Sequence, residues 1–327
     1  MPRIARRQFI FAVGAAAVAW PFPLRAQQGK RIPRIGVLLF GTPDTDPNLP
    51  AFLRGLRDLG YIEAQNIIIE YRYADGKPDR LRGLAGELVA IKPDLIFALG
   101  GDVAPSARVA TTTIPIVVAV SNDPVQAGLV ASLAHPGGNI TGVTFVSSDL
   151  AAKRLQFLRE VAPNLARLGV IWNPDHVDPE YREIQSAAKT LGIQIRSLEV
   201  RSAGDFDAAF EAAANDRVQA LLPITSRLVL INRARIIEFS SQRQLLLASG
   251  FGPWAREGAL LSYGPDTDAS TKRAAVYVDK ILRGAKPSEL PVEQPTKFQL
   301  VINSKIAKSL SLNIPASLLA TADQIIE

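Results

Sequence analysis

Short apolar runs alternate with amphipathic stretches along most of this chain. In the first half, runs rich in Ile, Val and Leu occur at 35–40, 67–71, 94–99, 116–120 and 140–145. Such runs are typical of strands buried on both faces of a parallel sheet. Leucines at helical spacing occur between them at 52–59 and 81–89, and Gly60 ends the first of these helices. The alternation predicts an open parallel sheet with right-handed crossovers.

The same order of elements occurs a second time, displaced by roughly 130 residues. We expect strands at 168–172, 193–195, 220–224 and 245–248, and helices at 181–191 and 206–214. Gly192 ends the first of these helices, as Gly60 does in the first half. A single large sheet fits this pattern less well, because single cores stop growing at about 250–300 residues. The fold class is therefore α/β, with two similar Rossmann-like lobes.

Three segments connect the two lobes in this interpretation. The strand at 140–145 leads to a helix at 150–161, and an apolar run at 260–264 precedes another amphipathic helix. Pro287, Pro291 and Pro295 then predict a stiff, extended crossing segment. We expect an N-terminal lobe of residues 31–145 plus about 266–293, and a C-terminal lobe of residues 146–265 plus about 294–327, joined by a three-segment hinge.

Ligands of open parallel sheets bind beyond the carboxyl ends of the strands. If the two lobes face each other, both sets of strand-end loops border one cleft, and hinge motion would close it. The predicted ligand-binding residues follow these strand ends or face them: Phe40, Gly41, Gly101, Asp102, Ser121, Asn122, Asp123, Asn173, Thr225, Ser226, Arg227, Phe251 and Tyr263.

The residue types of this set suit an amino acid or a related small zwitterion. Asp102 or Asp123 would pair with an ammonium group, and Arg227 with a carboxylate. Hydroxyl groups and helix N-termini also favour a carboxylate, and the aromatic members, together with Trp254, would enclose an apolar side chain. Asp123 has an alternative role as a helix cap before Pro124, and Asn173 as a turn residue.

The N-terminal segment 1–26 is predicted to be a cleavable export signal. An arginine pair, Arg6 and Arg7, precedes an apolar run at 9–20, which is too short to span a bilayer. Pro21 and Pro23 end that run, and a small residue, Ala26, offers a cleavage site. The pair resembles a twin-arginine signal, and an ordinary Sec signal remains the alternative. We expect a mature periplasmic protein that does not span the membrane.

Composition narrows the classes of function. Four of the arginines behind the formal charge of +6 lie in the export signal, which has no acid, so about +2 remains. We find no clustered basic block and expect no nucleic-acid partner. The chain has no cysteine, which excludes disulfides, thiolate chemistry and a cysteine-linked lipid anchor. We expect a monomer with no cofactor and no metal.

Catalytic motifs are not evident. His135 and His176 are the two histidines, and we interpret both as surface residues, although His176 follows a strand end and would be able to face the cleft. There is no G-x-S-x-G elbow and no H-E-x-x-H zinc motif. The protein is therefore not expected to be an enzyme; a periplasmic hydrolase is the weakest alternative.

Several stretches resemble one known family. They are "DPVQAGLVASLAHPGGNITGV", "KRLQFLREVAPNLARLGVIWNP", "SYGPD" and the C-terminal stretch from "RAAVYVDKILRG" onward. Together they resemble the ABC-transporter substrate-binding proteins of the tryptophan/tyrosine-type group, and the resemblance covers nearly the whole mature chain. It implies a type I periplasmic-binding fold and a receptor that delivers a small solute to an inner-membrane permease.

The chain departs from the family pattern at two places. The loop before Tyr263 usually carries a polar Ser-Arg-acid cluster in the family and reads "SGFGPWAREGA" here; a position that is commonly arginine is His135. The first departure lies where a ligand would bind, so the family's ligand does not transfer directly. A ligand-sensing subunit that docks on a membrane receptor would share this fold and remains an alternative to transport.

Overall fold

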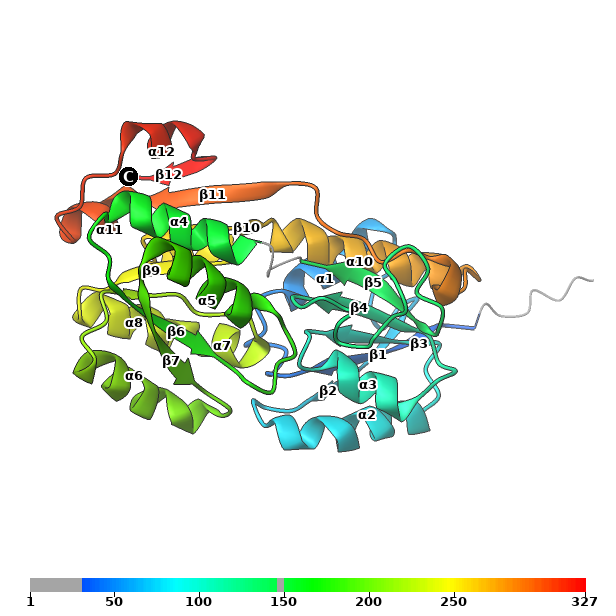
Figure 1. Cartoon of the computed structure of the whole chain (residues 1–327). Helices are drawn as coiled ribbons and strands as arrows, with labels where there is room; N and C mark the ends of the chain where they lie inside the picture. Colours follow the sequence, from blue (N-terminus) through cyan, green and yellow to red (C-terminus); the bar gives the residue numbers. More distant parts are fainter. Residues whose placement is uncertain (1–30, 146–149) are drawn as a thin grey trace, which may run out of the picture. The chain divides into compact units, whose positions relative to one another are not determined.

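The computed structural model describes residues 31–145 and 150–327 of the chain. The chain divides into two units, 1–31 and 32–327, and the fold below is that of the second unit. The predicted export signal at 1–26 lies outside the described residues. Within the second unit, two lobes are each built on a sheet of their own (Figure 1).

The sheet of the first lobe has five strands, all parallel, in the order β2-β1-β3-β4-β5. The strands are β1 (Arg34–Leu39), β2 (Ile68–Tyr73), β3 (Leu95–Leu99), β4 (Ile116–Val120) and β5 (Ile140–Thr144). The helices of this lobe are α1 (Leu49–Asp58), α2 (Leu81–Ala90), α3 (Ala104–Ala110) and α10 (Thr267–Leu282). This lobe therefore has the predicted open parallel architecture.

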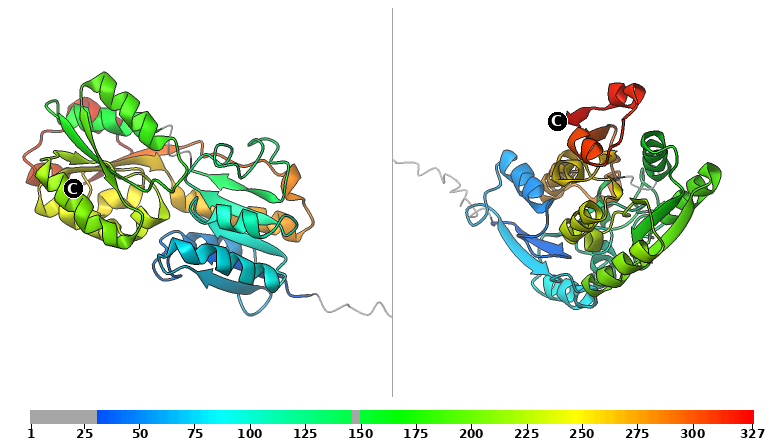
Figure 2. Two further views of the ribbon diagram at one scale, coloured as in Figure 1. Left: turned by 60° about the horizontal axis from the view of Figure 1, so that its bottom comes forward. Right: turned by 90° about the vertical axis from the view of Figure 1, so that its left-hand side faces the viewer.

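Alternation along the strands builds two separate apolar layers. Ile35, Val37 and Leu39 of β1 belong to the core under α1 and α10, whereas Leu38 belongs to the core under α2 and α3. Figure 2 shows α2 and α3 lying together over the first sheet. Because both faces are covered, the strands read as continuous apolar runs in the sequence.

One glycine allows α1 and α10 to pack closely over the first sheet. A Cβ atom at Gly55 would lie 2.7 Å from the Lys272 carbonyl oxygen and 2.8 Å from the Ala275 Cβ. Phe52 of α1 stacks on Phe97 of β3, with ring centroids 3.8 Å apart. These contacts bind α10, a late segment of the chain, to the N-terminal lobe.

The sheet of the second lobe has seven strands in the order β12-β11-β10-β9-β8-β6-β7, and only the β10–β11 pair is antiparallel. They are β6 (Arg167–Trp172), β7 (Gln194–Glu199), β8 (Ala220–Leu221), β9 (Leu246–Ser249), β10 (Leu261–Pro265), β11 (Phe298–Asn303) and β12 (Gln324–Ile326). The helices are α4 (Ala151–Val161), α5 (Glu180–Leu191), α6 (Phe206–Asn215), α7 (Arg227–Ile231), α8 (Arg233–Gln242), α9 (Gly252–Glu257), α11 (Ser304–Ser309) and α12 (Ala316–Thr321). Short 3-10 turns occur at Pro78–Arg80, Ala203–Asp205 and Pro287–Glu289.

The chain passes between the lobes three times. It leaves β5 for α4, returns from β10 to α10, and leaves α10 again for β11, which Figure 1 draws in orange. On the last passage, the Glu293 amide donates to the Gly142 carbonyl and the Thr144 amide donates to the Glu293 carbonyl, at 3.0 and 2.9 Å. The predicted architecture of two α/β lobes is confirmed, and the last crossing segment runs along the edge strand β5.

Two local predictions differ from the structure. Asp123 does not cap a helix: its Oδ1 accepts hydrogen bonds from the amides of Val125 and Gln126 in a turn. The strand expected at 220–224 is assigned only at Ala220–Leu221. Pro223 has no N–H to donate, although the amides of Leu222 and Ile224 still bond to β6.

Candidate functional site

The carboxyl ends of the two sheets meet through polar contacts. After β4, the Ser121 hydroxyl donates to the Thr225 carbonyl oxygen at 3.1 Å, and the Asn122 side-chain amide donates to the Val177 carbonyl oxygen at 3.0 Å. Ser121 and Asn122 belong to the first lobe, whereas Thr225 and Val177 follow β8 and β6 of the second. The predicted facing of strand-end loops therefore matches the contacts observed.

Residues 225–231 of the second lobe form a first contact region, which we call the latch. The Arg227 guanidinium donates to Asp46 at 3.2 Å and to the Asn48 side-chain oxygen at 3.0 Å, both in the loop between β1 and α1. The Arg227 amide donates to Asp102 Oδ2 at 2.6 Å. The side chains of Arg227 and Asp46 are 5% and 0% exposed, so this ion pair is almost completely removed from solvent.

Glycines of the first lobe make room for the latch. A Cβ atom at Gly100, where φ is +121°, would lie 2.5 Å from the Arg227 Cγ. At Gly41 it would lie 3.3 Å from Ile231 Cγ2. Any larger side chain at Gly100 would collide with Arg227 and would also be strained in its backbone. The latch therefore fits the first lobe through close van der Waals packing as well as through the Arg227–Asp46 ion pair.

The loop that follows β6 forms a second contact region, residues 173–180. A turn begins it: Asn173 Oδ1 accepts from the Asp175 amide at 3.0 Å, and the His176 amide donates to the Asn173 carbonyl oxygen at 3.1 Å. The turn directs His176 across the interface, where its Nδ1 pairs with Asp102. The ring also lies against Gly101, where a Cβ atom would be 2.7 Å from His176 Cε1 and 2.6 Å from Asn122 Oδ1.

Three polar atoms of the interface are buried without a hydrogen-bond partner: Asn122 Oδ1, His176 Nε2 and Asp178 Oδ2. Asn122 is 1% exposed as a residue, and the side chains of His176 and Asp178 are each 2% exposed. His176 Nε2 and Asp178 Oδ2 are 3.9 Å apart, which is too far for a hydrogen bond. Unpaired buried polar atoms are rare in folded proteins and require an explanation.

The charges of this cluster shift its pKa values. Burial, reinforced by the neighbouring Glu180, raises the pKa of Asp178 to about 7. Burial alone would lower the pKa of His176, but Asp102, Asp178 and Glu180 together outweigh it and raise that pKa. Burial opposes ionisation of Asp102 as well, yet His176 and the Arg227 amide lower its pKa. The favoured state is therefore a charged His176 beside an ionised Asp102, with Asp178 titrating near neutral pH.

A buried ion pair of the second lobe supports the loop from behind. Arg154 of α4 pairs with Glu180, the first residue of α5, and both side chains are 0% exposed. Arg154 Nε also donates to the Tyr263 carbonyl oxygen at 2.8 Å. Gly250 leaves room for the guanidinium, since a Cβ atom there would lie 2.8 Å from Arg154 Nη2. The ion pair fixes the start of α5 at Glu180, and this in turn restricts the position of Asp178, two residues earlier.

A family model described as ABC transporter substrate binding protein matches residues 38–326. This range includes every residue of the lobe interface described above, and all of both sheets except residues 34–37 of β1. The chain belongs to this family. The resemblance to the tryptophan/tyrosine-type group is thereby confirmed, and the structure describes both lobes of a substrate-binding protein.

Individual relatives agree with this assignment. A tyrosine-binding protein of Clostridioides difficile is 25% identical over 273 residues, which cover 83% of this chain and 78% of the relative. A conserved domain protein of Vibrio cholerae is 28% identical, with a TM-score of 0.83 over 90% of this chain and 100% of that one. A Streptococcus pneumoniae ABC domain in complex with L-Trp is 25% identical, with a TM-score of 0.81 over 90% and 99%.

Most of the predicted ligand-binding residues come together at the interface of this substrate-binding protein. Nine of them contact the opposite lobe or flank the residues that do: Gly41, Gly101, Asp102, Ser121, Asn122, Asn173, Thr225, Ser226 and Arg227. Their partners often differ from those expected. Arg227 and Asp102 bond to protein groups of the opposite lobe, so neither is a free ligand for a zwitterion in this arrangement.

The remaining predicted residues have other surroundings. Phe40 and Phe251 are 1% and 6% exposed within the apolar core, and Trp254 is in the same core. The Tyr263 ring packs edge-on against Phe157, at 5.2 Å between centroids. Asp123 belongs to the turn described above. These aromatic rings are therefore held by apolar packing inside the protein.

His176 requires a correction, because its side chain is buried in the lobe interface and is not on the surface. Asp46, Asn48 and Asp178 were not predicted at all. The sequence carried one usable signal for the last of these: the stretch "NPDHVDPE" after β6 places Asp175, His176, Asp178 and Glu180 within six residues.

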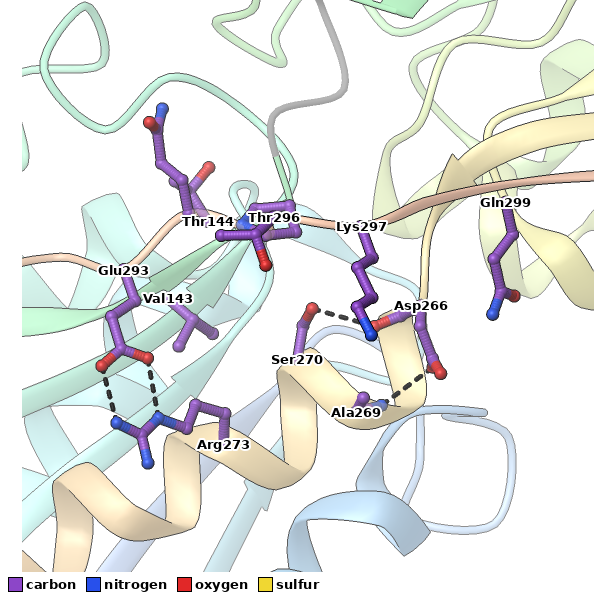
Figure 3. Close-up of a pocket in the computed structure, with 12 residues that line it drawn as sticks. Val143, Thr144, Asp266, Ala269, Ser270, Arg273, Glu293, Thr296, Lys297 and Gln299 are labelled. Carbon is purple, nitrogen blue, oxygen red and sulfur yellow. Dashed lines mark hydrogen bonds and ion pairs between the residues drawn. The ribbon is translucent and has the colours of Figure 1, made fainter.

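A separate cavity of about 500 Å³ lies at the crossing segments and is lined by none of the predicted site residues. Figure 3 shows Arg273 of α10 facing Glu293 of the last crossing segment, with two hydrogen bonds of 2.7 and 2.8 Å. Asp266 caps α10 by accepting from the Ala269 amide at 2.9 Å. Since α10 belongs to the first lobe and 294–299 leads into the second, this cavity borders the hinge.

Two absences hold for residues 31–145 and 150–327, the part of the chain that the structure describes. Within these ranges, no helix combines the length and apolar character needed to cross a membrane. The same ranges contain no cluster of three or more His, Asp or Glu side chains suited to holding a metal ion.

Proposed function

We propose that this protein is the periplasmic solute-binding component of an ABC importer. It takes a small solute between its lobes, closes over it by hinge motion, and delivers it to an inner-membrane permease. The family assignment and the predicted export signal support the importer role. The protein acts by binding and not by catalysis, in keeping with its family.

The observation that carries this proposal is the pairing of strand ends across the interface. Both sheets direct their carboxyl-terminal loops at the same place, which is where open parallel sheets bind ligands. The contacts between them include three buried polar atoms that the protein itself does not satisfy. Because leaving such atoms unpaired costs stability, a bound solute that pairs with them would favour the closed arrangement.

The solute enters when the lobes separate. In the arrangement described, His176 and Asn122 lie directly over Gly101, and all three are at or near full burial. Access therefore requires the second lobe to move away about the three crossing segments. Hinge closure of this kind is a common motion of two-lobed binding proteins.

Calorimetry tests the proposal with the mature chain, residues 27–327. The panel contains the twenty amino acids, simple sugars and small organic acids. We expect one-to-one binding without conversion of the solute. A ligand at 100 times its Kd should add about 2.7 kcal/mol to the free energy of unfolding. Conversion of a bound solute to a product would contradict the proposal, and so would an unchanged scattering profile at saturation.

A further inference from the structure

The His176 ring is held between two carboxylates that come from different lobes. Its Nδ1 pairs with Asp102, in the loop between β3 and α3 of the first lobe. Its Nε2 lies 3.9 Å from Asp178 Oδ2 of its own lobe, which is within the range of an ion pair although too far for a hydrogen bond. The His176 side chain is 2% exposed and that of Asp102 is 7% exposed. An imidazole that faces an acid through each nitrogen is favoured in its charged form.

Asp102 receives both contact regions of the second lobe. One of its carboxylate oxygens pairs with the His176 ring, and the other accepts from the Arg227 amide at 2.6 Å. Gly101 lets the ring approach, because a Cβ atom at that position would lie 2.7 Å from His176 Cε1. When the lobes separate, the ring and the carboxylate must therefore part.

Closure changes the charge beside the ring chiefly through Asp102. The other charged groups of this cluster belong to the same lobe as the ring: Asp178, Glu180, Arg154 and Arg227. Rigid-body motion about the crossing segments leaves them beside the ring whether the lobes are together or apart. The nearby first-lobe acid Asp46 is paired with the Arg227 guanidinium. Closing the lobes thus brings the Asp102 carboxylate to His176, and opening them removes it.

We propose that His176 makes closure of the lobes proton-dependent: the ring takes up a proton from solvent as the lobes close and releases it as they separate. The inference rests on the hinge motion of the proposed function and adds a control of that motion. A proton that binds the closed arrangement more tightly than the open one favours closure to the same extent. Acid pH therefore favours the closed arrangement, and alkaline pH favours separated lobes.

The electrostatics of the cluster agree with this sign. Burial alone would lower the pKa of His176, because desolvation disfavours the charged ring. The charge and the hydrogen bond of Asp102, followed by the charges of Asp178 and Glu180, outweigh burial and raise that pKa. Burial raises the pKa of Asp178 to about 7, so this acid also holds a proton more tightly in the closed interface. Burial would raise the pKa of Asp102 too, but His176 and the Arg227 amide lower it, and its opposite effect is confined to pH below about 3.8.

The first experiment measures the separation of the lobes in the solute-free mature chain, residues 27–327, from pH 5 to pH 8 at constant ionic strength. The chain has no cysteine, so Arg82→Cys in α2 and Glu211→Cys in α6 place one spin label at an exposed position of each lobe. Pulsed electron paramagnetic resonance then gives the populations of short and long distances. We expect the ratio of closed to separated lobes to fall at least about tenfold from pH 5 to pH 8. A ratio that stays constant would overturn the inference.

The second experiment repeats this measurement in His176→Asn, with His135→Asn as its matched control. Asn keeps a side-chain donor for Asp102 but does not titrate. His135 is the other histidine of the chain and is exposed in the loop before β5. We expect His176→Asn to lose most of the pH response and His135→Asn to keep it. An undiminished response in His176→Asn would overturn the role of this ring. Native melting checks that both variants fold.

The third measurement needs no substitution at the interface. Because the chain has two histidines, an NMR titration of the mature wild-type protein follows two imidazole rings. We expect the pKa of His176 to lie above its ordinary value of 6.5; a value at or below 6.5 would mean that burial outweighs Asp102, and the inference would fail. None of these samples contains solute. Their failure would therefore leave the calorimetric test of the proposed function intact, whereas a panel in which nothing binds would contradict the proposed function alone.

Discussion

The latch, residues 225–231, and the loop 173–180 both carry the second lobe onto strand ends of the first, but they differ in how completely their polar groups are satisfied. In the latch, no buried side-chain atom among those described lacks a partner. In the region formed by the loop and its partner Asn122, the atoms Asn122 Oδ1, His176 Nε2 and Asp178 Oδ2 do. The latch is therefore complete as a contact between protein groups, whereas the loop is complete only when a further molecule contributes.

The two regions therefore contribute differently to closure: one stabilises the closed arrangement, and the other makes closure depend on solute. A satisfied contact stabilises the closed arrangement whether or not a solute is present. An unsatisfied contact makes closure depend on a molecule that supplies the missing groups. Differential affinity for the closed state, and not affinity alone, shifts the lobes. Substitutions in the two regions should accordingly have different consequences with and without solute.

Among effects on the free energy of unfolding, the largest is expected from the pH dependence of Asp178. Its pKa in the folded protein is about 7 against an ordinary 3.8. Between these values the folded state binds more protons than the unfolded state, so stability falls as pH rises from about 4 to about 7. The loss should be on the order of 3 kcal/mol relative to Asp178→Asn. Denaturant unfolding of both proteins at pH 5 and pH 8 measures it.

Other titratable groups that face Asp178 also change stability with pH, so the effect of Asp178 is measured as the difference between wild type and Asp178→Asn. The raised pKa of His176 gives stability below about 6.5 that is lost at higher pH, in the same direction as Asp178. The lowered pKa of Asp102 gives stability above about 3.8 that is lost in acid. Glu180 and Arg154 are present in both proteins. Parallel stability curves for wild type and Asp178→Asn between pH 4 and 8 would contradict the assignment.

The second effect concerns the latch. Arg227→Ala would leave Asp46 buried without its cation, and breaking a buried pair costs about 3–5 kcal/mol. Opening of the lobes returns Asp46 to water and avoids this cost. We therefore expect the variant to favour the open arrangement, with a larger radius of gyration in solution scattering and weaker solute binding.

Arg201→Ala is the matched control, because its side chain is 55% exposed on the second lobe and pairs only with exposed acids. It should leave the scattering profile as in wild type. If Arg227→Ala also leaves it unchanged and binds solute normally, the latch does not stabilise closure.

The third effect is steric. In Gly101→Ala, the new Cβ would lie 2.6 Å from Asn122 Oδ1 and 2.7 Å from His176 Cε1 in the closed arrangement. Overpacking of this kind costs about 1–3 kcal/mol, and here only when the lobes are together. We expect solute affinity to fall about tenfold or more.

Gly83→Ala provides the comparison for Gly101→Ala. Gly83 is exposed in α2 with nothing within 4 Å of its new Cβ. This change should raise the free energy of unfolding by about 0.5–1 kcal/mol without altering affinity. A fall in affinity in both variants would show that the effect is not specific to the interface.

Local patterning was sufficient to predict the framework, and insufficient to predict which polar groups pair. The apolar run at 116–120 corresponds to β4 because a strand buried on both faces must be apolar throughout. β12, three residues long, carries no comparable signal and forms only because β11 is available beside it. Pro223 shortened the assigned strand β8 although the apolar run continues.

Asp178 shows why the site was harder to predict than the fold. Its sequence neighbours, Asp175 and Pro179, are those of an ordinary surface turn, and Asp175 is indeed exposed. The burial of Asp178 comes from its contact with the rest of the interface and from Glu180 behind it. Arg227 was predicted for the solute, but Asp46 and Asn48, residues of a distant loop, bind it instead. Such pairings depend on the approach of two lobes, which no local pattern records.

The smallest effect is expected at the hinge, which lies outside both the latch and the loop. Arg273 and Glu293 join α10 to the last crossing segment, but their side chains are 44% and 36% exposed. Exposed ion pairs contribute about 0.2–1 kcal/mol and are screened by salt. Arg273→Ala should thus cost less than about 1 kcal/mol of stability, and less still at high salt. A double-mutant cycle with Glu293→Gln isolates the pair.

Because the Arg273 hydrogen bond lowers the pKa of Glu293, the contribution of this ion pair to stability should disappear as pH falls below about 4.5. Loss of several kcal/mol in this cycle would mean that the hinge segment, and not the lobe interface, determines whether the lobes stay closed.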